Sequence, residues 1–98
     1  MRVRFSTAAI VDVEAIRAYI TEDDPQAADR VVSRIGDVVE LLRDFPLLGH
    51  KGTVGGTFEI VVPRMPYIVV DELGGEDGAE MVILRVFHGA QDRSGDRA

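Results

Sequence analysis

The chain has 98 residues, with 17 acidic against 11 basic side chains, a formal net charge of −6, no cysteine and a single lysine. This length accommodates one domain with one hydrophobic core, and the missing cysteines exclude disulfides and thiolate metal sites. With two isolated histidines and few basic residues, we expect no metal, no cofactor and no sequence-specific nucleic-acid binding, and a protein partner instead.

The N-terminal residues predict a strand followed by a helix. Charged and apolar residues alternate from Arg2 to Ser6, as in a short strand with one buried face. Ser6 or Thr7 can cap a helix that ends near Glu22, because a hydroxyl accepts from free N–H groups of the first turn. The apolar stripe expected to face the core comprises Ala9, Ile10, Val13, Ile16, Tyr19 and Ile20. The polar face comprises Asp12, Glu14 and Arg17.

A second helix is predicted to begin at Asp24-Pro25, since Asp is a good N-cap and Pro is tolerated in the first turn. It ends before Pro46 and packs against the first helix as an antiparallel hairpin. Gly36 predicts a close contact between the two helices. The apolar positions with helical spacing are Ala28, Val31, Val32, Ile35, Val38, Val39, Leu42 and Phe45.

The rest of the chain predicts a sheet. After a glycine-rich loop at residues 47–56, β-rich runs occupy residues 57–63, 67–73 and 80–88, as in an antiparallel meander. Met81 to Phe87 is apolar except at Arg85, which is typical of a central strand. The fold class is therefore α+β, in the order β-α-α-β-β-β, with the helix hairpin on one face of a small, mostly antiparallel sheet.

We expect residues 1–93 to form a single domain and residues 94–98 a flexible tail. The N-terminus lacks an apolar leader, and no stretch approaches the roughly 18 apolar residues of a membrane span. The sequence therefore predicts a cytoplasmic protein without membrane contact.

Few residues could carry chemistry. A ribonuclease that activates the 2′-OH needs a base, an acid and cations, roles that His88, Glu59, Arg64 and Arg85 could fill. Arg85 and His88 are three residues apart, so a regular strand sends their side chains to opposite faces. The alternative is structural: Arg85 paired with Glu59, Asp71 or Glu72 of neighbouring strands, and His88 hydrogen-bonded to backbone or to Asp92.

Six features together resemble the ParE branch of the RelE/ParE toxin superfamily, often called plasmid stabilisation proteins. They are the β-α-α-β-β-β order and residues 25–30, 45–49, 56–59, 67–70 and 83–92. The resemblance covers Val3 to Arg93 and implies the RelE/ParE-like fold and a toxin of a bacterial type II toxin–antitoxin module. The chain departs from the family at Phe58, where an arginine is usual. The loss of this positive charge argues against RNA chemistry.

The resemblance also implies a ParD-like antitoxin that forms a hetero-oligomer with the toxin, and DNA gyrase as the poisoned target. On this interpretation the chain is a binding protein rather than an enzyme. The alternative is a RelE-like, ribosome-dependent mRNA endoribonuclease, and a third possibility is a family member that binds its antitoxin and harms nothing. The residues expected to bind the antitoxin are Arg17, Tyr19, Arg64 and Arg85.

Overall fold

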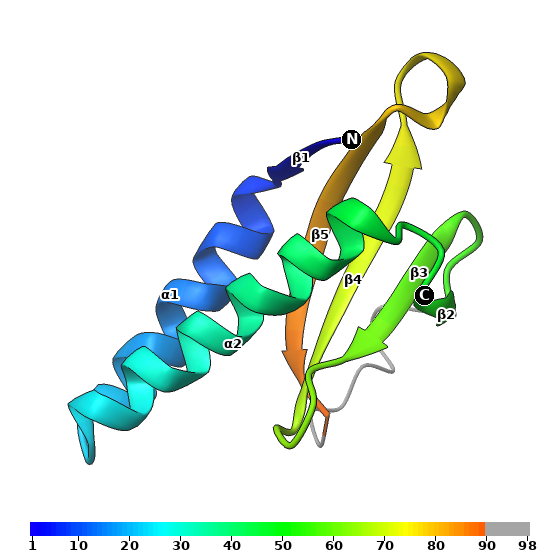
Figure 1. Ribbon diagram of the computed structural model, residues 1–98. Coiled ribbons are helices and arrows are strands. Elements are labelled where there is room, and N and C mark those ends of the chain that lie inside the picture. Colours follow the sequence, from blue (N-terminus) through cyan, green and yellow to red (C-terminus); the bar gives the residue numbers. More distant parts are fainter. Residues whose placement is uncertain (90–98) are drawn as a thin grey trace.

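A computed structural model describes residues 1–89, so the predicted tail at 94–98 lies outside the described residues. Two long helices lie side by side and cover one face of a twisted sheet (Figure 1). The elements are β1 (Arg2–Phe5), α1 (Thr7–Thr21), α2 (Pro25–Asp44), β2 (His50–Lys51), β3 (Thr57–Val61), β4 (Tyr67–Gly74), a 3₁₀ turn η1 (Glu76–Gly78) and β5 (Glu80–His88).

The strand order in the sheet is β1-β5-β4-β3-β2. β1 runs parallel to β5, and the other neighbouring pairs are antiparallel. The predicted α+β class and mostly antiparallel sheet are therefore confirmed. Two details differ from the prediction. The middle position belongs to β4, with β5 between β1 and β4, and the glycine-rich loop contributes the short strand β2, whose His50 pairs with Glu59.

Both predicted helix starts are confirmed. The Ser6 hydroxyl accepts from the Ala9 N–H at 3.0 Å, and the Asp24 carboxylate accepts from the Ala27 N–H at 3.1 Å. Each side chain satisfies an N–H group that has no partner within its own helix. Local hydrogen bonds thus set where each helix begins.

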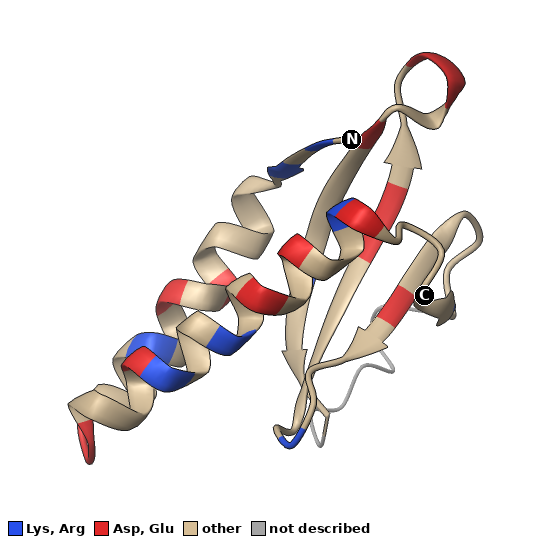
Figure 2. Ribbon diagram, viewed as in Figure 1, with Lys and Arg blue, Asp and Glu red and all other residues tan. Residues whose placement is uncertain are grey.

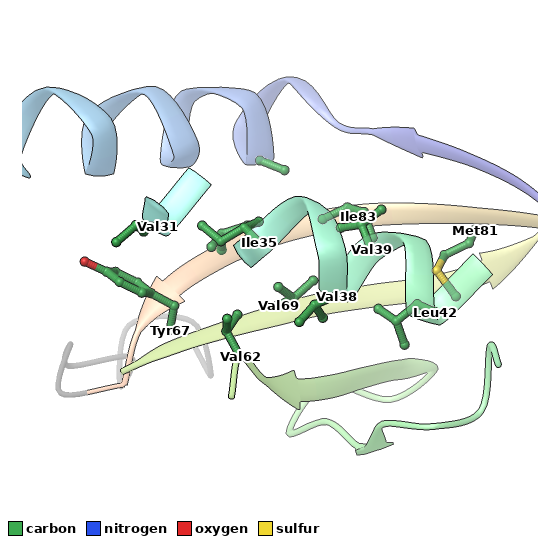
Figure 3. Close-up of a cluster of buried hydrophobic side chains, with 12 residues drawn as sticks. Val31, Ile35, Val38, Val39, Leu42, Val62, Tyr67, Val69, Met81 and Ile83 are labelled. Atoms are coloured by element: carbon green, nitrogen blue, oxygen red, sulfur yellow. The ribbon is translucent and has the colours of Figure 1, made fainter. Parts of the chain in front are cut away.

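The core lies between α2 and the sheet (Figure 3). α2 buries the positions expected of it except Val32, which is half-buried, and Phe45, which is 59% exposed. The buried apolar side chains of this cluster are Ala9, Val31, Ile35, Val38, Val39, Leu42, Val62, Tyr67, Val69, Met81, Ile83 and Val86.

The apolar stripe predicted for α1 was too wide. Ile10 is 51% exposed and Tyr19 is 76% exposed. At about 100° per residue, both side chains lie roughly 90° around the helix from the centre of its buried side. Ala9, Val13, Ile16 and Ile20 alone face the core.

The prediction for Gly36 was wrong. A β-carbon at this position would meet no atom within 4 Å, so no close helix–helix contact requires glycine there. The helices share apolar contacts in the core, and an ion pair also links them, in which Arg17 Nη1 donates to Asp29 Oδ1 at 3.2 Å.

A β-bulge in β5 sets which side chains reach each face of the sheet. Val70 pairs with Arg85, but the next residue, Asp71, pairs with Ile83, so that Leu84 is the extra residue. Before the bulge Ile83 faces the helices, and after it Val86 does. The bulge therefore keeps apolar side chains on the core side of β5 from Met81 to Val86.

Asp71 occupies a core position of β4, opposite Ile83. Its side chain is fully buried, and neither carboxylate oxygen has a hydrogen-bond partner. Burial raises the pKa of Asp71 from 3.8 to about 6, because the charged form loses its hydration.

The folded protein therefore binds the Asp71 proton more tightly than the unfolded chain does. Its stability falls as the pH rises from about 4 to about 6, and above that range an ionised Asp71 costs on the order of 3 kcal/mol. Replacing Asp71 with Asn should raise the free energy of unfolding by up to about this amount at pH 7.5 and have little effect at pH 4. Urea unfolding at both pH values measures the difference.

The matched control is Asp77→Asn, in the exposed turn before β5, which reports the loss of a surface charge alone. An Asp71→Asn effect of equal size at both pH values would contradict a buried, ionised carboxylate.

Candidate functional site

The four residues of the ribonuclease hypothesis do not assemble into one site. Glu59 and Arg85 line one pocket of about 190 Å³ on the sheet face opposite the helices. His88 lines another pocket on the helix side, and Arg64 lies in the exposed turn between β3 and β4 with a positive φ of 64°. The predicted separation of Arg85 and His88 onto opposite faces is therefore confirmed.

Arg85 is bound by a residue that the sequence analysis placed on the polar face of α1. Asp12 Oδ2 accepts from Arg85 Nε at 2.8 Å, and Asp12 Oδ1 accepts from Arg85 Nη2 at 3.0 Å. The guanidinium carbon also lies 4.7 Å from the ring centroid of Phe87. The expected pairing of Arg85 with Glu59, Asp71 or Glu72 was wrong, because α1 brings Asp12 to the edge of β5.

Asp12 also accepts from the backbone N–H of Val86 at 2.8 Å. β1 pairs with β5 only as far as Ile83, so this N–H points to an edge with no neighbouring strand. The Asp12 carboxylate thus neutralises the Arg85 guanidinium and also accepts a hydrogen bond from a backbone N–H at the edge of the sheet. Its side chain is 15% exposed, against 38% for Arg85, so the bidentate pair is partly shielded from water.

Glu59 lies on the open face of the sheet and is 6% exposed. Its Oε2 accepts from the Thr53 N–H at 3.3 Å, which ties the glycine-rich loop to β3. The pocket around it is otherwise largely apolar and is completed by Val54, Thr57, Val70, Leu84, Arg85 and Phe87.

A second pocket lies where the end of β5 meets α1. It measures about 430 Å³ and is lined by Ala15, Ile16, Tyr19, Tyr67 and His88. The rings of Tyr67 and His88 meet edge to face, with centroids 5.5 Å apart and planes at 85°. Tyr67 is 8% exposed and points toward Val31 of α2 (Figure 3). Tyr19 is 76% exposed.

The chemistry of this second pocket is that of a binding site. Burial, followed by the nearby Tyr19, raises the pKa of Tyr67 above its ordinary value. Its phenol therefore stays protonated at neutral pH and cannot serve as a base. The pocket offers aromatic and aliphatic surface with one imidazole, which suits an apolar anchor from a partner.

The pocket continues along the outward side of α1. Between Ala8 and Tyr19 this side carries no charged residue, although all of its residues are exposed. An apolar helix face turned to solvent is typical of a protein interaction site. We call this band the α1 surface; it comprises Ala8, Val11, Ala15, Ala18 and Tyr19.

The four residues predicted to bind an antitoxin lie in different places. Tyr19 belongs to the α1 surface, Arg17 is paired with Asp29 between the helices, Arg85 is held by Asp12, and Arg64 lies in the β3–β4 turn. Their role stays a prediction. Tyr67 and Asp12 were missed, because a tyrosine that opens a strand and an aspartate on a helix carry no local signal of their partners.

Within residues 1–89 no group of three or more His, Cys, Asp or Glu side chains could hold a metal ion. No helix of this part of the chain is long and apolar enough to cross a membrane.

A family model for the ParE toxin of the type II toxin–antitoxin system parDE matches residues 3–93. The chain belongs to the ParE toxin family. The resemblance inferred from the sequence is thereby confirmed, and with it the general class of type II toxin. A curated relative from Sinorhizobium fredii, named "Putative toxin Y4kP", is 38% identical over 90 residues, covering 92% of this chain and 90% of the relative.

Solved structures of related toxins share the fold. A chain of the "Chromosomal ParDE TA system from P. aeruginosa" gives a TM-score of 0.78 at 24% identity, covering 90% of this chain and 95% of that one. The structure of the isolated E. coli RelE toxin gives a TM-score of 0.59 at 9% identity, and the match covers 97% of this chain and 90% of the RelE chain. At these identities the likeness is one of fold alone.

Asp12 should contribute strongly to the stability of this ParE-family chain. Asp12→Ala removes three hydrogen bonds and leaves the Arg85 guanidinium and the Val86 N–H without this partner, which we expect to cost about 2–3 kcal/mol. Urea unfolding measures the loss. The matched control is Asp29→Ala, which breaks the more exposed pair with Arg17 and should cost about 0.5 kcal/mol or less. Equal losses in the two variants would contradict this role for Asp12.

Proposed function

We propose that this ParE-family toxin acts by binding and poisoning DNA gyrase, and that a ParD-like antitoxin neutralises it by direct contact in a hetero-oligomer. Both partners are cytoplasmic, so the toxin acts there, as part of a plasmid-stabilising or chromosomal module. Membership of the family whose model names the parDE system supports this choice of partner.

The dispersal of the ribonuclease residues is the observation that carries the proposal. RNA cleavage needs a base, an acid and a cation around one phosphate. Here His88 and Arg85 lie on opposite faces of β5, and the charge of Arg85 is already engaged by Asp12. Such an arrangement supports a toxin that works through its surface, rather than through an active site.

The antitoxin is proposed to dock on the α1 surface. An amphipathic helix that lies along α1 would place its anchors against Val11, Ala15 and Tyr19, with one anchor in the pocket beside Tyr67 and His88. The absence of charge along this band favours an apolar partner segment. A segment that folds only on the toxin would fit this surface, because it gains its ordered structure from the contact.

The first test is a supercoiling assay with the purified chain, bacterial DNA gyrase and ATP, beside a translation reaction in which mRNA integrity is followed. We expect loss of supercoiling or trapped cleaved DNA, with mRNA intact. The variant His88→Ala should inhibit gyrase as the parent does, because the imidazole performs no catalysis. Cut mRNA with unaffected gyrase would overturn the proposal and make His88 and Arg85 the next residues to mutate.

The second test concerns the antitoxin surface. Tyr19→Ala removes the aromatic side chain of the α1 surface, which is 76% exposed. This change should weaken the binding of a ParD-like antitoxin by at least tenfold, because aromatic anchors often contribute much of the binding free energy of an interface. Ala15→Glu should do the same by placing a charge in the band. Isothermal titration calorimetry gives the Kd.

The control is Ile10→Ala, a 51% exposed residue on another side of the same helix, which should leave the affinity within about twofold of the parent. Unchanged affinity in both Tyr19→Ala and Ala15→Glu, with the fold intact, would remove the antitoxin from this surface.

A further inference from the structure

A second group of exposed apolar side chains follows the C-terminal end of α2. Within eight residues, four large side chains face solvent: Leu41 (42% exposed), Phe45 (59%), Leu47 (69%) and Leu48 (51%). We call them the Leu41–Leu48 patch. Single exposed apolar residues are ordinary on protein surfaces, whereas a contiguous group of large ones is typical of an interaction site.

Folding does not explain why these residues are apolar. The core under this end of α2 is formed by Val38, Val39 and Leu42, and Leu42 is fully buried. α2 ends at Asp44, so Phe45, Leu47 and Leu48 lie beyond the helix and point outward. Polar residues at these positions would leave the core unchanged.

A shallow groove extends the patch toward the sheet. It measures about 290 Å³ and lies between α2 and the segment that follows β3, with Arg34, Asp37, Val38, Leu41 and Pro63 as its lining. The guanidinium of Arg34 donates to the Pro63 carbonyl oxygen at 3.5 Å across the groove's lining. At Leu41 the patch therefore borders a groove that can receive a side chain of a partner.

Acidic residues lie along one side of the patch. The C-terminal half of α2 presents exposed carboxylates at Asp37, Glu40 and Asp44 (Figure 2). Two basic side chains lie near them: Arg43 is paired with Glu40 at 3.5 Å, and Arg34 donates to the Pro63 carbonyl. An apolar centre with an acidic rim complements a protein surface that carries basic side chains around an apolar depression.

The Leu41–Leu48 patch and the α1 surface lie on different flanks of the helix hairpin. The groove beside the patch is lined by α2 and Pro63, whereas the pocket of the α1 surface is lined by α1, Tyr67 and His88. Figure 1 shows the C-terminal end of α2 over β4 and β3, away from α1. The chain can therefore bind two different proteins through two different surfaces.

We infer that the Leu41–Leu48 patch is the surface by which the toxin docks on its target, and that the docking face of the target is basic. This inference rests on the proposed function, since an enzyme that handles DNA presents basic surfaces to the phosphate backbone. The acidic residues beside the patch can bind such a basic surface in competition with the phosphate groups of DNA.

Two variants test the inference by different physical routes. Phe45→Ser with Leu48→Ser removes the apolar centre, and Asp37→Lys with Asp44→Lys reverses the rim. All four positions are exposed, so the fold should survive, which thermal unfolding checks. The matched control is Val61→Ser, a 53% exposed apolar residue on β3 outside the patch.

Each protein is assayed for gyrase inhibition, for antitoxin affinity and for growth arrest when expressed without antitoxin. We expect both double variants to require at least tenfold more protein to inhibit supercoiling and to lose growth arrest. Their antitoxin Kd should stay within about twofold of the parent, and Val61→Ser should match the parent in all three assays.

The outcomes separate the two proposals. Parent-like growth arrest in both folded double variants would overturn the docking surface, whatever the target is. A parent chain that arrests growth but leaves gyrase unaffected would overturn gyrase as the target, and loss of arrest in the variants would still support the patch. A parent chain that neither arrests growth nor inhibits gyrase would overturn both. Loss of antitoxin binding together with toxicity would assign the patch to the antitoxin and overturn the inference.

Discussion

The arrangement of this molecule depends on the edge of β5 that β1 leaves uncovered. β1 is four residues long and β5 is nine, so the second half of β5 would expose unpaired backbone groups at the rim of the sheet. The start of α1 supplies the missing partners. The Ser6 hydroxyl donates to the Leu84 carbonyl at 2.8 Å, and the Asp12 carboxylate accepts from the Val86 N–H at 2.8 Å. These contacts fix α1 along the sheet rim.

The position of α1 has two consequences for the surface of the protein. Asp12 engages the guanidinium of Arg85 through two hydrogen bonds at the rim of the sheet. The same position turns Val11 and Tyr19 outward, beside the pocket at the end of β5. One constraint on backbone hydrogen bonding thus engages the charge of Arg85 and leaves an apolar stretch of α1 exposed.

Sequence patterns predicted the elements well because their signals are local. Ser6 and Asp24 cap helices, Pro25 opens one, and alternation or apolar runs mark the strands. What could not be predicted depends on contacts between distant segments. The residues around Asp12 in the sequence do not indicate that its side chain reaches Arg85. Tyr19 and Phe45 have the apolar character and helical spacing of core residues, but no neighbouring element covers them.

The candidate site was predicted only in part for the same reason. Tyr19 and His88 were named for separate roles, one in antitoxin binding and one in catalysis, and the fold places both in one pocket. The parity of β5 correctly separated Arg85 from His88, since the bulge at Leu84 precedes both residues. A bulge between Arg85 and His88 would have placed both side chains on the same face, and no sequence pattern would have indicated it.

The single extra residue in β5, Leu84, also determines which side chains lie on each face of the sheet. Gain or loss of one residue near Leu84 reverses which side chains of the strand's second half meet the helices and which meet the open face. A backbone of this shape can therefore exchange the contents of its two surfaces through one insertion or deletion, with every strand pairing partner kept. Such a slip in register would change the chemistry of both surfaces at once, an effect that counting substitutions would overlook.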